Sequence, residues 1–202
     1  AIIEATTGDA KVSDITVTDA DSDAVVVTAL NGTADVSGVD IDGVVNGTAL
    51  DVTAKDANVS DVNLSNVEKG AEITATEGNA TVSGIDVANA TDDAVVVSAV
   101  NGTADVSDIG LTNITGDNGL KVESQDAVVD DVTVNGGNGT NAVSVETTGD
   151  AKVSNVNMTD YNGTGVNAKS ETGNVDVANT TATGGEGTAV KVDAANGTAT
   201  IT

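Results

Sequence analysis

The sequence has no histidine, cysteine, proline, phenylalanine, tryptophan or arginine, and Tyr161 is its only aromatic residue. The missing cysteine excludes disulfides, and the missing aromatics argue against a thick globular core, which usually needs bulky side chains. Apolar residues make up 39% of the chain, but nearly all of them are Ala, Val and Ile. No apolar run reaches the length of about 18 residues that a transmembrane helix needs. The composition therefore suits a thin core only.

Positive charge is also scarce. Seven lysines face 32 acidic residues, so the formal net charge is −25. Such a surface should repel nucleic acid and anionic membranes, and we expect neither as a partner. Salt or divalent cations would relieve the repulsion, since at 1 M ionic strength charges are screened within about 3 Å.

The groups that catalysis commonly uses are missing as well. With no Arg, no His and only scattered lysines, the chain lacks both a positive clamp for an acidic substrate and the most common general base. Composition alone leaves a glycosidase with two carboxylates open, but carbohydrate sites normally use aromatic platforms. We predict that the protein is not an enzyme and needs no cofactor.

A repeat runs through the whole chain. Its unit is A-x-V-x-x-[VI]-x-[VIL], and successive units start 24, 23, 23, 24, 23, 24, 24 and 24 residues apart. Full-length copies start at Ala10, Ala34, Ala57, Ala80, Ala104, Ala127 and Ala151, the last with Met158 at its final position; a degraded copy starts at Val175, and a truncated copy starts at Ala199. A fixed period in this range is typical of solenoids.

Each unit predicts two short strands separated by a bend. Its apolar residues alternate, skip by three across pairs such as Ser13-Asp14, and alternate again; alternation indicates a strand with one buried face. A third alternating stretch, such as Val25/Val27/Ala29, precedes each unit. We therefore predict an all-β fold, a right-handed parallel β-helix (β-solenoid) of about nine coils with three short strands per coil. The handedness follows from the general preference of parallel crossovers.

One corner of every coil has a restricted composition. Two residues past each unit stands Asn, Asp or Gly, the residues that most readily accept a positive φ. The residues at this corner are Asp19, Gly43, Asn66, Asn89, Asn113, Gly136, Asp160 and Gly184. We expect Asn66, Asn89 and Asn113 to stack on three successive coils as an inward-facing structural ladder of hydrogen-bonded amides.

Longer repeats indicate duplication within a single domain, residues 1–202. Asn31 to Ser37 recurs identically 70 residues later, and Thr7 to Ser13 recurs 141 residues later. The chain thus divides into three blocks of three coils, approximately 1–70, 71–141 and 142–202. Neither end of the sequence resembles a capping helix or a charged cap. We expect either a longer solenoid or two ends that meet in a non-closing, head-to-tail homopolymer.

Acidic corners raise the question of metal binding. Asp19, Asp21 and Asp23 resemble the start of a calcium loop, but position 6 is Ala24 instead of Gly and position 12 is Leu30 instead of Glu. Weak calcium binding that relieves charge repulsion is one interpretation, and solvated acidic turns are the other.

Sequons for N-glycosylation are abundant. N-x-[ST] occurs at thirteen of the twenty asparagines, whereas random placement would give roughly four. Asn-Gly-Thr is also a good corner, which could account for Asn31, Asn101 and Asn196 but not for Asn58, Asn63 or Asn157. Leaving Asn89 and Asn113 to the ladder, the candidates are Asn31, Asn46, Asn58, Asn63, Asn79, Asn101, Asn138, Asn157, Asn162, Asn179 and Asn196.

The Ala-x-Val-x-x-Val-x-Val coils with Asn, Asp or Gly corners resemble right-handed parallel β-helix proteins of the pectate-lyase-like superfamily. The resemblance covers the whole chain and implies a fold, because none of that family's catalytic motifs matches a position here. The acidic, arginine-free, Asn- and Thr-rich composition resembles that of archaeal cell-surface proteins. We therefore expect an extracellular structural protein of the cell surface that stacks end to end into a filament or array. The alternative is an adhesin stalk or passenger that binds glycans or partner cells.

Overall fold

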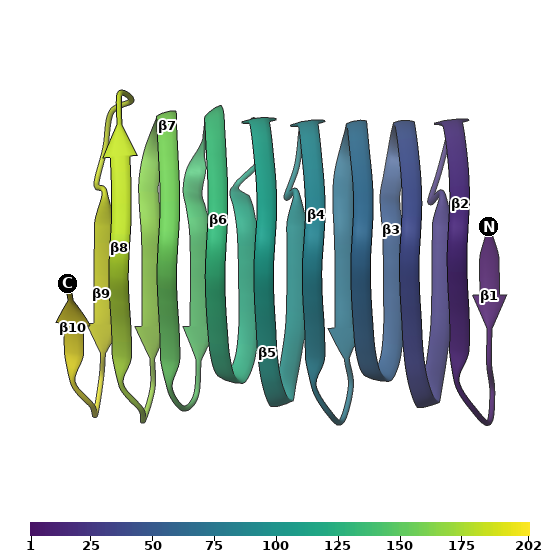
Figure 1. Cartoon of the computed structure of the whole chain (residues 1–202), viewed down its shortest axis with the longest axis horizontal. Coiled ribbons are helices and arrows are strands. Elements are labelled where there is room, and N and C mark those ends of the chain that lie inside the picture. The colour runs from purple at the N-terminus through teal and green to yellow at the C-terminus, as the bar shows by residue number, and fades with distance from the viewer.

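The computed structural model describes residues 1–202 and confirms a parallel β-solenoid. It contains ten strands and no helix: β1 (Ile2–Glu4), β2 (Ala10–Ala20), β3 (Val25–Ala75), β4 (Ala80–Ala90), β5 (Val95–Ile114), β6 (Asn118–Thr147), β7 (Ala151–Ser170), β8 (Val175–Thr183), β9 (Val190–Ala194) and β10 (Ala199–Ile201). All inter-strand pairings between these elements are parallel. The coils stack side by side along one axis, with the two termini at opposite ends (Figure 1).

Each coil contributes to three faces. We call face 1 the stack that contains Ala10–Ser13, face 2 the stack that contains Ile15–Thr18, and face 3 the stack that contains Val25–Thr28. Residues pair with their counterparts one repeat later, for example Val12 with Val36 and Val17 with Ile41. The chain makes about eight full turns, and β10 begins a further one by pairing with β8. The predicted repeat is thus the structural repeat.

The strands differ from the prediction in one respect. Three separate short strands per coil were expected, but ladder pairing continues around many corners, so that β3 alone spans 51 residues and more than two coils. Corners that keep the pairing hold adjacent coils together there as well as on the faces. The structure has 148 backbone hydrogen bonds in all.

Two corners of each coil depend on a residue with positive φ. At the corner between faces 2 and 3, all eight predicted positions have this conformation, from Asp19 (φ 54°) to Gly184 (φ 69°). The corner between faces 1 and 2 has a second series of eight, which sequence analysis identified only as a bend. Its members are Asp14, Gly38, Asp61, Gly84, Asp108, Asp131, Asn155 and Asn179.

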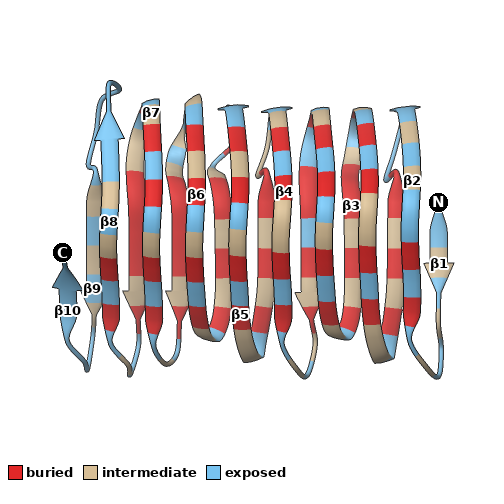
Figure 2. Ribbon diagram, in the orientation of Figure 1, coloured by how far each residue is buried: buried red, intermediate tan, exposed pale blue.

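The core is a single thin cluster of 55 buried residues, most of them Ala, Val and Ile. Buried and exposed residues alternate along the strands, and the buried positions line up from coil to coil (Figure 2). Burial decreases in the end coils, where inward-facing residues such as Ile15 and Val192 are only partly covered. Stability in such an array comes mainly from contacts between neighbouring coils.

Candidate functional site

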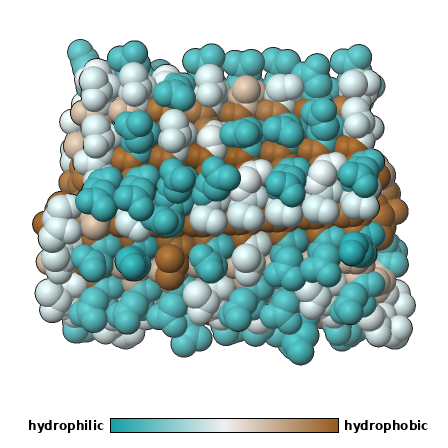
Figure 3. Space-filling model, in the orientation of Figure 1, coloured by the Kyte–Doolittle hydropathy of each residue, from teal (hydrophilic) through white to brown (hydrophobic).

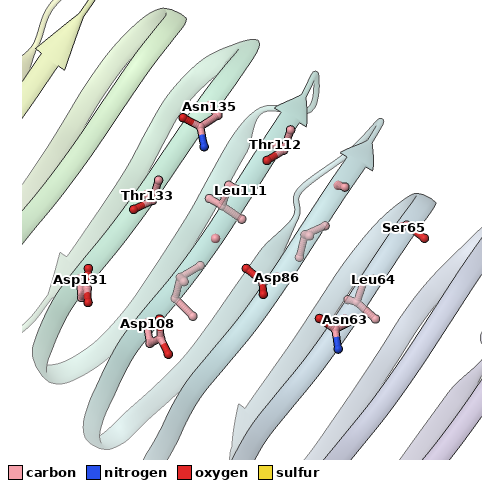
Figure 4. A pocket seen from close by; sticks show the side chains of 14 residues that line it. Asn63, Leu64, Ser65, Asp86, Asp108, Leu111, Thr112, Asp131, Thr133 and Asn135 are labelled. Carbon is pink, nitrogen blue, oxygen red and sulfur yellow. The ribbon is translucent and has the colours of Figure 1, made fainter.

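Face 2 carries a shallow groove of about 500 Å³ near the middle of the rod. Two of its outward positions hold small residues: Ala88, which pairs in register with Ser65 and Thr112, and Gly110, which pairs with Asp86 and Thr133. The lining residues lie on successive coils (Figure 4), and the apolar ones among them, such as Leu64 and Leu111, are buried in the core. The groove offers amides, hydroxyls and the carboxylates of Asp86, Asp108 and Asp131, a lining suited to a neutral polyhydroxyl or cationic ligand.

Sequence analysis missed this groove. The outward positions of face 2 were visible in the repeat, but which side chains are neighbours on successive coils depends on the register between coils. The sequence held one indication of the groove: Gly110 stands at the position where the two preceding coils have Asp86 and Asn63.

The predicted calcium residues do not form a cluster. Asp19, Asp21 and Asp23 are all exposed, and no group of three or more acidic side chains is placed to hold a metal ion. Asp23 has a structural contact instead, because its Oδ1 accepts a hydrogen bond of 2.8 Å from the backbone N–H of Thr48 in the next coil.

The amide ladder runs along the outside of the rod. Nδ2 of Asn89 donates to Oδ1 of Asn66 at 3.1 Å, and Nδ2 of Asn113 donates to Oδ1 of Asn89 at 3.3 Å. All three side chains are exposed, so the expectation that they face inward is wrong. The error arises at the corner, where a residue with positive φ interrupts the alternation of inward and outward side chains.

A second side-chain series lies at the corner between faces 3 and 1. There a carboxylate or amide oxygen accepts a hydrogen bond from the backbone N–H at the same place in the next coil, as Asp9 does from Thr33. The same contact joins Asp56 to Asn79, Asn79 to Thr103, Asp126 to Asp150, Asp150 to Asn174, and Asn174 to Thr198. The series forms three runs, each of which begins with Asp and ends with Thr. Each contact satisfies a backbone donor that the strands leave free.

All thirteen sequon asparagines are exposed. Those in the three repeated Asn-Gly-Thr corners, Asn31, Asn101 and Asn196, donate from Nδ2 to backbone carbonyls of the preceding coil at 2.8 to 3.0 Å. These sequons therefore act as corner motifs, as the structural interpretation of Asn-Gly-Thr predicts.

Charged side chains on face 3 lie close together. Lys169 pairs with Glu146 of the preceding coil at 3.0 Å, and Lys121 pairs with Glu123 at 3.1 Å. The hydrogen bond from Lys121 to Glu123 raises the pKa of the lysine. Burial, with smaller contributions from Glu72 and Asp23, raises the pKa of Asp51. These shifts follow from the packing of neighbouring coils in the stack.

Tyr161 is the one buried aromatic side chain. Its hydroxyl is buried without a hydrogen-bond partner, and burial raises its pKa to about 12. The ring fills a position that Gly137 and Gly185 occupy in the neighbouring coils. Tyr161 therefore acts as a packing residue.

Comparison with protein families, with curated proteins and with solved structures finds no match for this chain. The structure contains no helix that is long and apolar enough to cross a membrane.

Proposed function

We propose that the protein is a non-enzymatic, extracellular structural subunit whose solenoids stack end to end in a surface filament or array. Within this proposal it is a right-handed β-helix of the pectate-lyase-like type and an acidic cell-surface protein of the archaeal kind. Both assignments rest on coil pattern and composition.

The sheet edges at the two ends of the rod support stacking. β1 pairs only with β3, and β10 pairs only with β8, so each has one edge free to pair with another strand. The core-facing Ile201 is 57% exposed, whereas Val177, one coil below, is fully buried. Hydrophobic residues are visible at both ends of the rod, and also between the rows of polar side chains that run along its length (Figure 3).

The observation that carries the proposal is the match between the two ends. If one chain stacks on the next, Ile3 lies over Val192, and Ala10 and Val12 lie over Ala199 and Ile201, which continues the same aliphatic layers. At the corner between faces 3 and 1, Thr198 then lies beneath Asp9. This Thr-to-Asp step already occurs within the chain, between Thr33 and Asp56 and between Thr103 and Asp126.

The junction would nevertheless be weaker than an internal one. Residues 1–202 supply no face 2 strand between Thr180–Thr183 and the Ile15–Thr18 strand of the next chain, so one strand of that face is missing there. Glu4 would also lie over Asp193. We therefore expect assembly that depends on protein concentration and is promoted by salt.

Electron microscopy and sedimentation of residues 1–202 test this proposal. The expected result is unbranched rods that lengthen with concentration and have a repeat of about 43 Å, the height of the nine strands that each chain adds to faces 1 and 3 at a spacing of about 4.8 Å. Ile201→Asp should abolish assembly. Leu30→Asp should not, although Leu30 is similarly exposed, at 53% against 57% for Ile201, because it lies on the side of the rod. Dispersed short rods at every concentration would contradict the proposal.

The groove on face 2 favours the alternative function, a stalk or passenger module that binds glycans or partner cells. Binding of neutral oligosaccharides that is lost on Gly110→Asp, without assembly of rods, would favour this alternative.

A further inference from the structure

We infer that three of the thirteen sequons, those at Asn79, Asn157 and Asn162, are N-glycan acceptor sites, and that the other ten have mainly structural roles. The proposed chemistry is transfer of an oligosaccharide from a polyprenyl-phosphate carrier to the side-chain amide. The inference rests on the extracellular location in the proposed function but not on end-to-end stacking.

Seven sequons have an engaged amide nitrogen. The Nδ2 atoms of Asn31, Asn58, Asn89, Asn101, Asn113, Asn179 and Asn196 donate hydrogen bonds to groups in the preceding coil. These bonds measure 2.8 to 3.3 Å, and neighbouring coils lie only about 4.8 Å apart. A sugar on such a nitrogen would have to displace the contact between coils.

The remaining six sequons fall into two groups according to whether the hydroxyl of their third residue, Ser or Thr, is accessible and free of hydrogen bonds. Transfer depends on that Ser or Thr as well as on the asparagine. Thr48, in the Asn46 sequon, is buried. Ser65, in the Asn63 sequon, donates to Asp42 at 2.7 Å, and Thr140, in the Asn138 sequon, donates to Asp117 at 3.3 Å.

The three sequons that pass both criteria have a free amide nitrogen and a hydroxyl without a hydrogen bond. Their hydroxyls belong to Thr81, Thr159 and Thr164, none of which is buried.

In two of the three the amide is also oriented. Oδ1 of Asn79 accepts from the backbone N–H of Thr103 at 2.9 Å, and Oδ1 of Asn162 accepts from that of Glu186 at 2.9 Å. With the oxygen held against the next coil, Nδ2 is left on the solvent side. Asn157 instead lies on the outer face of face 2, paired in register with Thr133 and Thr181.

The transfer step balances with the named donor. Nδ2 attacks C1 of the first sugar and forms the N–C1 bond, while the C1–O bond to the carrier phosphate breaks. The phosphate leaves with the bonding electron pair, and the amide nitrogen loses one of its two protons to a base of the transferase. One N–H remains on the modified asparagine.

The test compares the folded protein with its own peptides. Peptides that contain the thirteen sequons are prepared from the protein with an Asp/Glu-specific protease, and an oligosaccharyltransferase that modifies all of them is chosen. This enzyme is then supplied with the intact protein and a polyprenyl-linked oligosaccharide. Mass spectrometry then gives the occupancy of each sequon. We expect Asn79, Asn157 and Asn162 to exceed each of the other ten by about tenfold or more, roughly the effect of breaking one hydrogen bond before transfer.

Substitutions supply the matched controls. Asn157→Gln should remove one glycan and leave the unfolding midpoint unchanged, whereas Asn89→Gln should lower the midpoint and leave the glycan pattern unchanged. Glycan occupancy at Asn31 or Asn89 equal to that at Asn157 would overturn the inference. So would a folded protein in which Asn79, Asn157 and Asn162 all stay unmodified while the corresponding peptides react. Because occupancy is measured site by site, the result does not depend on whether rods form.

Discussion

Nδ2 of Asn89 donates a hydrogen bond to Oδ1 of Asn66, 3.1 Å away in the preceding coil. Asn66 in turn donates to Asp42 at 2.7 Å. Every amide in this ladder points its nitrogen toward the N-terminal end of the rod, and the ladder ends on a carboxylate, which can only accept. Hydrogen bonds from Ser65 and Asn66 hold the pKa of Asp42 below its ordinary value.

A charge placed within the ladder should weaken it. In Asn89→Asp, a carboxylate oxygen replaces the nitrogen that faces Oδ1 of Asn66, so a hydrogen bond becomes a contact between two oxygens. Because Asp also accepts a positive φ, the backbone of the corner is preserved. We expect unfolding in urea to show a loss of about 1 kcal/mol.

Asn157→Asp is the control for this substitution. It adds the same charge at an exposed position, but its amide makes no hydrogen bond. The midpoints of the two variants should differ, and equal midpoints would show that the ladder does not contribute to stability.

Two glycines should respond differently to the same added methyl group. A Cβ on Gly102 would collide with the backbone carbonyl of Gly78 in the preceding coil, which cannot move aside. A Cβ on Gly110 would collide only with the carboxylate of Asp86, which can rotate away. We expect Gly102→Ala to cost about 1–3 kcal/mol and Gly110→Ala to leave the urea midpoint nearly unchanged. Similar losses in both variants would contradict this interpretation.

Asp51 should make stability depend on pH in a predictable direction. Its pKa is raised in the folded protein by burial first, and then by Glu72 and Asp23. The unfolded state therefore ionises first as pH rises above the ordinary value of 3.8, and stability falls until the folded carboxyl has also ionised. Asp51→Asn should raise the urea midpoint at neutral pH but not below 3.8.

The control for this prediction is Asp105→Asn, which removes an equal charge from an exposed position on face 1. Removing any one negative charge lowers the repulsion between the acidic groups of a protein whose net charge is −25, and this control measures that general gain in stability. An equal gain in both variants would show that the environment of Asp51 is not responsible.

The repeat alone predicted the coils because spacing and burial follow the same rule in every copy. The positive φ at residues such as Asp19 and Asn66 was also predictable, since only Asn, Asp and Gly occur at that position. By contrast, the contact between Asp9 and the N–H of Thr33 depends on register between coils. The second series, from Asp14 to Asn179, was missed because the bend was identified as a pair of residues without its conformation.

The direction of side chains beyond a corner was the least predictable feature. Within a strand, the alternation of side chains places Val12 inside and Lys11 outside. A single residue with positive φ at a corner interrupts this alternation, so it does not predict which side chains beyond the corner point inward. This is why the Asn66–Asn113 ladder was expected inside and lies outside. Whether a sequon amide is free or engaged depends on its neighbour in the preceding coil, as for Asn58 and Asp35, and therefore on the register between coils.

Cross-linking at the proposed junction tests end-to-end stacking most directly. Ile2 and Lys191 hold the same outward position on face 3, each just before an inward residue, and stacking would place them on adjacent strands. Because the chain has no cysteine, Ile2→Cys combined with Lys191→Cys creates the only two thiols, at a separation that a disulfide can span. Oxidation should give a ladder of covalent multimers, while Ile2→Cys combined with Lys152→Cys should not. If the variant with Ile2→Cys and Lys191→Cys gives only monomers under oxidising conditions, the result contradicts end-to-end stacking.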